Sequence, residues 1–102
     1  MKTCCKQYLD EQFGGDADMV NDIYGEYVAS MNEKAQEAVA ALEGASWAVL
    51  DRVAHTIKGN ALAAGDNDMA QLGIALRQAA KLQDASQAAS LIEGIKGMAQ
   101  EL

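Results

Sequence analysis

The absence of proline limits the possible folds of this chain more than any other feature of its sequence. Proline is the strongest helix breaker and alanine the strongest helix former, and 20 of the 102 residues are alanine. A sandwich or barrel instead needs turn-rich, β-branched sequence. Half of the residues are apolar, which is typical of a globular chain. We therefore expect one all-α domain over residues 1–102.

Acidic residues outnumber basic ones by 15 to 8, so the net charge is −7 at pH 7. This charge repels nucleic acids and disfavours anionic lipid, and we expect neither a nucleic-acid nor a membrane partner. No apolar stretch approaches the roughly 18 residues of a membrane span, and the N-terminus lacks a signal-peptide pattern. We expect a cytoplasmic protein. Cys4 and Cys5 are adjacent and lack zinc or redox spacing, which indicates two reduced thiols.

Apolar residues recur every three or four positions in five stretches, which is the pattern of amphipathic helices. Aspartate or serine precedes most of them as an N-cap, and Gly44 and Gly65 are expected to end the second and third. The expected helices are Thr3–Phe13, Asp16–Leu42, Ser46–Ala64, one from Asp66 or Asn67 to Ala80, and one from Asp84 to Leu102. Short connections make neighbouring helices antiparallel. The sequence thus predicts an up-down-up-down antiparallel four-helix bundle with an extra short N-terminal helix across one end.

His55 is the single histidine of the chain and lies within the third predicted helix. A helical wheel of about 100° per residue places it roughly 130° from the centre of the apolar stripe of that helix. We therefore expect the ring to face solvent or the flank of the bundle. A lone histidine in such a place is usually an ordinary surface residue.

Lys58 and Gly59 follow His55 by three and four residues, one helical turn away on the same side. A glycine inside a helix costs about 0.5–1 kcal/mol relative to alanine, so its presence in an alanine-rich helix asks for a reason. Here it clears space beside the imidazole, and the ammonium of Lys58 adds a positive charge. Such a site suits a bulky anion, and a phosphoryl group fits that description.

The run from Ala54 to Gly65, A-H-T-I-K-G-N-A-L-A-A-G, resembles the signature of histidine-containing phosphotransfer (Hpt) domains. That signature is A-H-x-[LI]-K-G with a second glycine further along, at the position of Gly65. The stretch Met69–Leu76 is similar to the next helix of the family. Phe13–Asp16, with the pattern of Val20–Tyr27 after it, is similar to the family's opening. The resemblance therefore covers nearly the whole chain.

Two residues depart from the family pattern. Asn60 stands where the family more often has serine. Gly73 interrupts the fourth predicted helix where a larger or β-branched residue is common. Neither departure removes the reactive ring, so they concern the fine packing around the site more than its function.

The resemblance implies that His55 is the phosphoacceptor of a phosphorelay intermediate, a carrier without kinase activity of its own. It takes the phosphoryl group from a receiver-domain aspartyl phosphate and passes it to another receiver. An ordinary histidine has a pKa of about 6.5, so near pH 7 it is mostly neutral and one ring nitrogen has a free lone pair. In the family Nε2 is the phosphorylated atom and Nδ1 keeps its proton. Lys58 would stabilise the phosphoryl oxygens, and Gly59 would leave room for them.

The expected partners are response-regulator receiver domains and a hybrid sensor histidine kinase, with the chain itself a monomer. Mg²⁺ is expected on the receiver, and we expect neither a cofactor nor a metal site in this chain. Arg77 and Lys81 are candidates to face His55 and contact the phosphoryl group or the partner, the alternative being ordinary surface charges. An apolar patch should dock the receiver. Its candidates, which could equally be core residues, are Leu62, Tyr8, Leu9 and Met19.

Two other functions are compatible with the sequence. The chain could be a helical-bundle binding module that grips a receiver or another signalling protein without accepting phosphate. A more distant alternative is an enzyme with His55 as general base, although no carboxylate partner or cofactor motif supports it. Met1 favours a free-standing protein over a piece of a larger kinase.

Overall fold

The computed structural model describes residues 1–102 as five α-helices without a strand. The helices are α1 (Thr3–Gln12), α2 (Ala17–Glu43), α3 (Trp47–Ala63), α4 (Asn67–Leu82) and α5 (Ala85–Glu101). Each begins and ends close to the residues expected from the sequence. The predicted all-α class is therefore confirmed.

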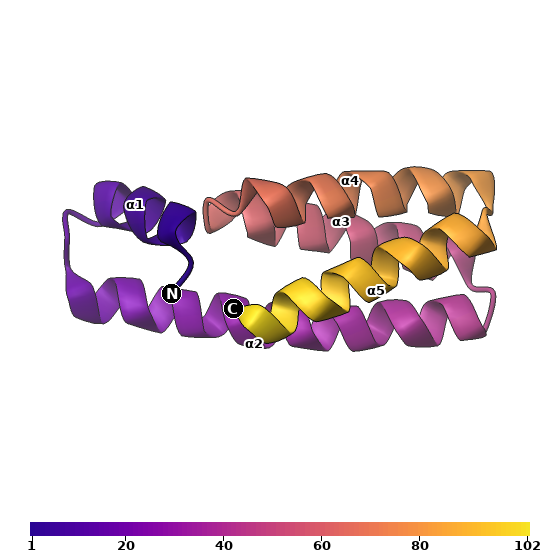
Figure 1. Ribbon diagram of the computed structural model, residues 1–102, viewed down its shortest axis with the longest axis horizontal. Helices are drawn as coiled ribbons and strands as arrows, with labels where there is room; N and C mark the ends of the chain where they lie inside the picture. The colour runs from indigo at the N-terminus through magenta and orange to yellow at the C-terminus, as the bar shows by residue number, and fades with distance from the viewer.

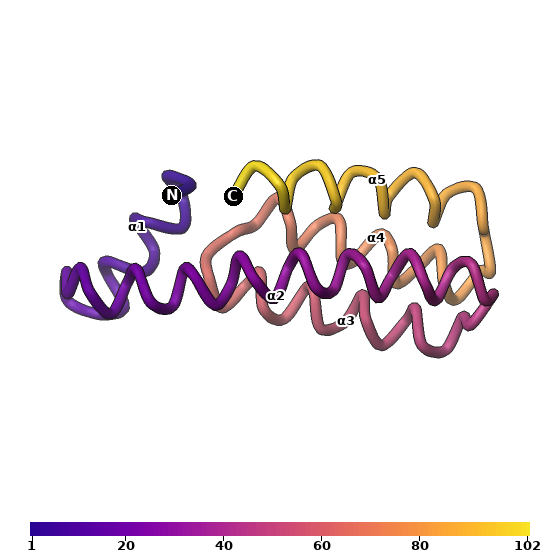
Figure 2. Tube along the Cα trace, turned by 90° about the horizontal axis from the view of Figure 1, so that it is seen from below, coloured from indigo at the N-terminus to yellow at the C-terminus, as the bar shows by residue number.

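The chain forms a rod of 43 × 18 × 18 Å, in which helices α2 to α5 lie side by side (Figures 1 and 2). The chain reverses at each connection, so that α3 packs on α2 and α4, and α5 packs on α4 and α2. The contact between α3 and α4 is the most extensive of these. Side chains on the outward side of α3 therefore have α4 as their neighbour.

Helix α2 is the longest helix and projects beyond the other three (Figure 1). Helix α1 lies against this projecting part, next to the connection between α3 and α4. Cys5 and Leu9 of α1 are fully buried. At Gly65 in the connection, φ is +74° and a Cβ would overlap the side chain of Tyr8. Only glycine fits this turn without displacing α1.

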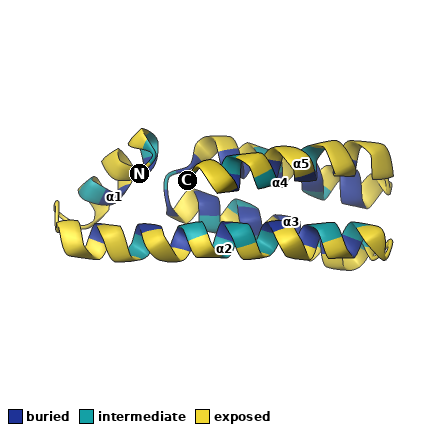
Figure 3. Cartoon of the chain, turned by 60° about the horizontal axis from the view of Figure 1, so that its bottom comes forward, coloured by how far each residue is buried: buried dark blue, intermediate teal, exposed yellow.

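The core runs along the rod between the inward faces of the helices (Figure 3). Its largest side chains come from the predicted apolar stripes. They include Met31, Leu50, Ile57, Met69, Leu76 and Ile95, all fully buried. Alanines fill much of the remaining core, and their small side chains let the helices approach closely. None of the five helices is sufficiently long and apolar to span a membrane.

The helix ends follow the predicted capping pattern with two exceptions. Asp16, Asp66 and Asp84 each accept a hydrogen bond from a backbone N–H three residues later. Ser46 precedes α3, but its hydroxyl makes no capping bond, so that part of the prediction is wrong. The left-handed residue between α2 and α3 is Ala45, with a φ of 51°, and not the preceding glycine. A non-glycine residue in this conformation costs about 1–2 kcal/mol.

Candidate functional site

His55 lies on the outward side of α3 with its side chain exposed, as the helical wheel predicted. Its helix neighbours Ala54 and Ile57 are fully buried and anchor this part of α3 in the core. The ring is therefore presented to solvent from a well-packed helix. A rigid element of this kind holds a reactive side chain more precisely than a loop does.

Arg77 of α4 contacts the ring of His55. Its Nη1 lies 3.2 Å from Nδ1 of the imidazole, and its Nε donates to Oδ1 of Asp51 at 3.0 Å. The guanidinium thus bridges two residues on one face of α3. Asp51 was not among the expected site residues, although it precedes His55 by four positions, the spacing that places two side chains on one helix face. Lys81, one turn beyond Arg77, is exposed and makes no ion pair or hydrogen bond.

The contact with Arg77 determines which nitrogen of the His55 ring can carry a proton. A guanidinium has only N–H donors, so Nδ1 must be the acceptor in this hydrogen bond. A neutral ring bound in this way carries its proton on Nε2. The family resemblance led us to expect the opposite, with the proton on Nδ1 and a free lone pair on Nε2. The arginine is the reason for the difference, because it cannot accept a hydrogen bond.

Gly73 brings α4 very close to α3 beside the site. A Cβ here would lie 2.9 Å from the backbone nitrogen of Lys58 and 3.1 Å from the carbonyl oxygen of Ala54. Backbone atoms cannot swing aside as a flexible side chain can, so a larger residue would push the two helices apart. The departure of Gly73 from the family pattern thus has a packing reason. It sets the helix separation at which Arg77, one turn further along α4, reaches His55.

Lys58 and Gly59 leave an unpaired charge and open space next to the ring. The Lys58 side chain is half-buried and makes no ion pair or hydrogen bond within the chain. A Cβ on Gly59 would meet nothing within 4 Å. The packing of this chain therefore does not require a glycine at position 59. An incoming group beside the ring, in contrast, would use that space.

The residues expected to dock a partner differ in their exposure. Leu62 lies two turns beyond His55 on α3 and is 46% exposed, as is Met19 at the start of α2. Tyr8 is exposed as well, and with Leu62 it lines a groove of about 510 Å³ between α1 and the α3–α4 connection. Leu9 is fully buried, so its prediction as a surface contact is wrong. It lies on the face of α1 that packs against the core.

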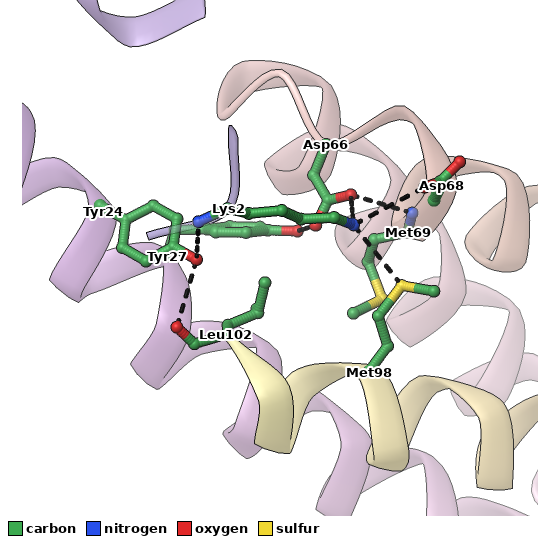
Figure 4. Close-up of polar contacts among 8 residues, drawn as sticks. All are labelled: Lys2, Tyr24, Tyr27, Asp66, Asp68, Met69, Met98 and Leu102. Atoms are coloured by element: carbon green, nitrogen blue, oxygen red, sulfur yellow. Dashed lines mark hydrogen bonds and ion pairs between the residues drawn. The ribbon is translucent and has the colours of Figure 1, made fainter. Parts of the chain in front are cut away.

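A second polar cluster surrounds Asp66, which begins α4 and is fully buried (Figure 4). Its carboxylate accepts hydrogen bonds from Lys2 Nζ at 2.6 Å and from the hydroxyl of Tyr27 at 2.7 Å. The hydroxyl of Tyr24 accepts from the backbone N–H of Lys2 and donates to the carbonyl of Leu102. The cluster therefore ties both ends of the chain to α2 and to the α3–α4 connection. The sequence predicted only the capping role of Asp66.

Asp66 raises three pKa values in this cluster, and burial adds to its effect at Tyr27 and Cys5 but opposes it at Lys2. Burial raises the pKa of Tyr27, and its hydrogen bond to Asp66 raises it further. Burial and the charge of Asp66 raise the pKa of the Cys5 thiol to about 12. Burial alone would lower the pKa of Lys2, but the hydrogen bond and charge of Asp66 outweigh this effect and raise it. All three groups keep their protons at neutral pH, which indicates a structural cluster.

Most of the chain, including the residues around His55, matches the model of one protein family. A model of the Hpt domain matches residues 22–102, from the second turn of α2 to the C-terminus. The match includes His55, Lys58 and Gly59, whereas α1 lies outside it. No curated protein and no solved structure matches the chain. No group of three or more His, Cys, Asp or Glu residues is placed to hold a metal ion.

Proposed function

The chain belongs to the Hpt domain family, and from this membership we propose that it is a phosphorelay intermediate with His55 as its phosphoacceptor. Domains of this family are phosphocarrier modules and not kinases, and they interact with receiver domains. In our proposal the phosphoryl group arrives from the aspartyl phosphate of one receiver and leaves to the aspartate of another. The scaffold is an up-down-up-down four-helix bundle that works as a monomer in the cytoplasm.

The observation that carries the proposal is the combination of an exposed imidazole, an unpaired ammonium and open space on one face of α3. Lys58 has no acidic partner that would neutralise it. A Cβ on Gly59 would meet no atom within 4 Å, so the space there is open. A bulky anion attached to His55 would gain a positive charge here without displacing any residue.

The proposed transfer forms a bond between Nε2 of His55 and the phosphorus atom while the bond from phosphorus to the aspartyl oxygen breaks. The receiver regains a free carboxylate, and the ring proton passes to solvent. Charge on the phosphoryl oxygens in the transition state is stabilised mainly by positioned cations. Lys58 supplies such a cation from this chain. Mg²⁺ belongs to the receiver in this proposal, and the chain uses no cofactor of its own.

We propose that the receiver docks on the face that carries His55. Leu62 and Tyr8 offer apolar area around the groove at the α3–α4 connection, and Met19 is a further exposed apolar contact. Arg77 and Lys81 add positive charge that complements the acidic site of a receiver. A hybrid sensor histidine kinase that carries a receiver domain is an expected donor.

Incubation with a receiver phosphorylated on its aspartate tests this proposal. Label should move to the chain and form an adduct that is labile in acid and stable in base, as expected of phosphohistidine. His55→Gln should abolish the adduct and leave the helical circular dichroism unchanged, because the side chain is exposed and makes a single hydrogen bond.

The same variant separates the carrier from the binding module. A carrier loses all regulation of its downstream receiver when His55 is replaced, although it can still bind that receiver. If His55→Gln binds and regulates the receiver as the unchanged chain does, the carrier proposal is wrong and a binding module is supported.

A further inference from the structure

Arg77 is the one side chain that hydrogen-bonds the ring of His55. Its guanidinium is oriented by the ion pair with Asp51, in which both side chains are about one-third exposed. The guanidinium is planar and rigid, so a contact at Nε also limits where Nη1 can lie, and little further conformational entropy is lost when Nη1 forms its own hydrogen bond. Asp51, which lies on the same helix as His55, therefore holds the Arg77 donor in position beside the ring.

We propose that Arg77, oriented by Asp51, is a positioning residue that keeps Nδ1 of His55 unprotonated both before and after phosphorylation. The part before phosphorylation stands on geometry alone, and the part after it rests on the proposed function. The charged groups within about one turn of the ring are Asp51, Arg52 and Lys58 from α3 and Arg77 from α4.

Before phosphorylation, the hydrogen bond from Arg77 selects the neutral tautomer with its proton on Nε2. In this form Nε2 has no lone pair with which to attack phosphorus. Attack through Nε2 requires Arg77 to release Nδ1, so that water can deliver a proton to Nδ1 and another can leave Nε2. The free chain thus rests in the less reactive form of its ring, and transfer begins with a change at Arg77.

After phosphorylation, Nε2 of His55 is bonded to phosphorus and the neutral ring has its lone pair on Nδ1. This lone pair can accept the hydrogen bond from Arg77 without any change of the protonation of the ring. Hydrolysis joins a water oxygen to phosphorus and breaks the N–P bond, giving inorganic phosphate and histidine. The ring leaves most easily when Nδ1 is protonated first, because a neutral imidazole then departs. Arg77 occupies that lone pair and its charge opposes an added proton, so it should slow the loss of the phosphoryl group.

Nitrogen NMR of the unphosphorylated, ring-labelled chain tests the first part. At mildly alkaline pH, where imidazoles are neutral, the shifts of the two nitrogens show which one carries the proton. We expect Nδ1 unprotonated in the unchanged chain, and a shift towards a mixture of tautomers in Arg77→Ala and, less strongly, in Asp51→Ala. Lys96→Ala is the control, since Lys96 lies on α5, which does not contact the helix that carries His55.

A protonated Nδ1 in the unchanged chain, or the same tautomer ratio in Arg77→Ala, would overturn this part. No phosphoryl group is involved, so the result stands even if the chain proves not to be a carrier.

The lifetime of the phosphorylated chain tests the second part. Arg77→Ala should lose phosphate about three- to tenfold faster than Lys96→Ala, the factor expected from the loss of one ordinary, solvent-exposed hydrogen bond. Equal lifetimes would overturn the second part.

Discussion

The ammonium of Lys2 lies 2.6 Å from the carboxylate of Asp66, although 64 positions separate the two residues in the chain. A carboxylate without partners is costly inside a protein. Here Lys2, Tyr27 and the backbone N–H of Met69 together satisfy it. The pair connects the first residues of the chain to the start of α4, the helix that carries Arg77.

Tyr27→Phe should lower the free energy of unfolding by about 1.5–3 kcal/mol, because it removes a buried hydrogen bond to a charged group. Urea denaturation followed by circular dichroism measures the change. Tyr24→Phe is the matched control, since its hydroxyl joins only backbone groups. It should cost about 0.5–1.5 kcal/mol, as a neutral hydrogen bond does. Equal losses for the two variants would contradict the central role of Asp66.

The fold should lose stability as the pH rises above about 9. The raised pKa values of Cys5, Tyr27 and Lys2 mean that the folded chain holds these protons more tightly than the unfolded chain does. The stability they contribute is complete below the unfolded-state pKa, which is 9.0 for the Cys5 thiol, and is lost as the pH rises towards its folded value of about 12. Urea midpoints measured across this range should fall, and Cys5→Ala should flatten the decline. An unchanged slope in that variant would show that Cys5 does not contribute.

Gly59→Ala should raise the free energy of unfolding by about 0.5–1 kcal/mol, because the new Cβ meets no atom and alanine favours a helix. A leucine at position 59 should leave the fold intact but block transfer to His55 by filling the space beside the ring. Gly25 of α2 is a matched control, since it is exposed in a helix and a Cβ there also meets nothing. Gly25→Leu should transfer normally. Equal transfer by both leucine variants would remove the steric argument.

Lys58→Ala should slow phosphoryl transfer about tenfold or more, because it removes a charge that acts on the transferring group. Its effect on unfolding should stay within about 0.5 kcal/mol, since no partner is left stranded. Single-turnover transfer from a phosphorylated receiver measures the rate, and titration with the same receiver measures docking. Lys96→Ala on α5, which does not contact α3, is the control. A loss of docking equal to the loss of rate would assign Lys58 to partner binding instead.

The helices and much of the core follow directly from the sequence, because helical spacing and capping residues are local signals. The outward position of His55 follows from the same spacing. Arg77 was a candidate to face His55, but its ion pair with Asp51 was not expected, because that contact depends on how closely α4 approaches α3. The separation of the two helices is set by Gly73, which in the sequence resembles an interruption of the helix but in the structure lies against the backbone of α3.

The features that the sequence-based expectations missed have related causes. Leu9 was placed on the surface because nothing local shows where α1 docks, and its burial depends on the projecting part of α2. Asp66 was recognised only as a cap because its partner Lys2 is distant in the chain. The tautomer of the ring was expected from the family, whereas the donor beside Nδ1 belongs to this chain.

Phosphorus NMR and mass spectrometry of the chain after incubation with a phosphorylated receiver measure the central claim most directly. The account predicts one phosphoryl group per chain, bonded to Nε2 of His55, and none on His55→Gln. A receiver that binds the chain yet loses its phosphate only to water, or a phosphoryl group found on any other residue, would contradict it.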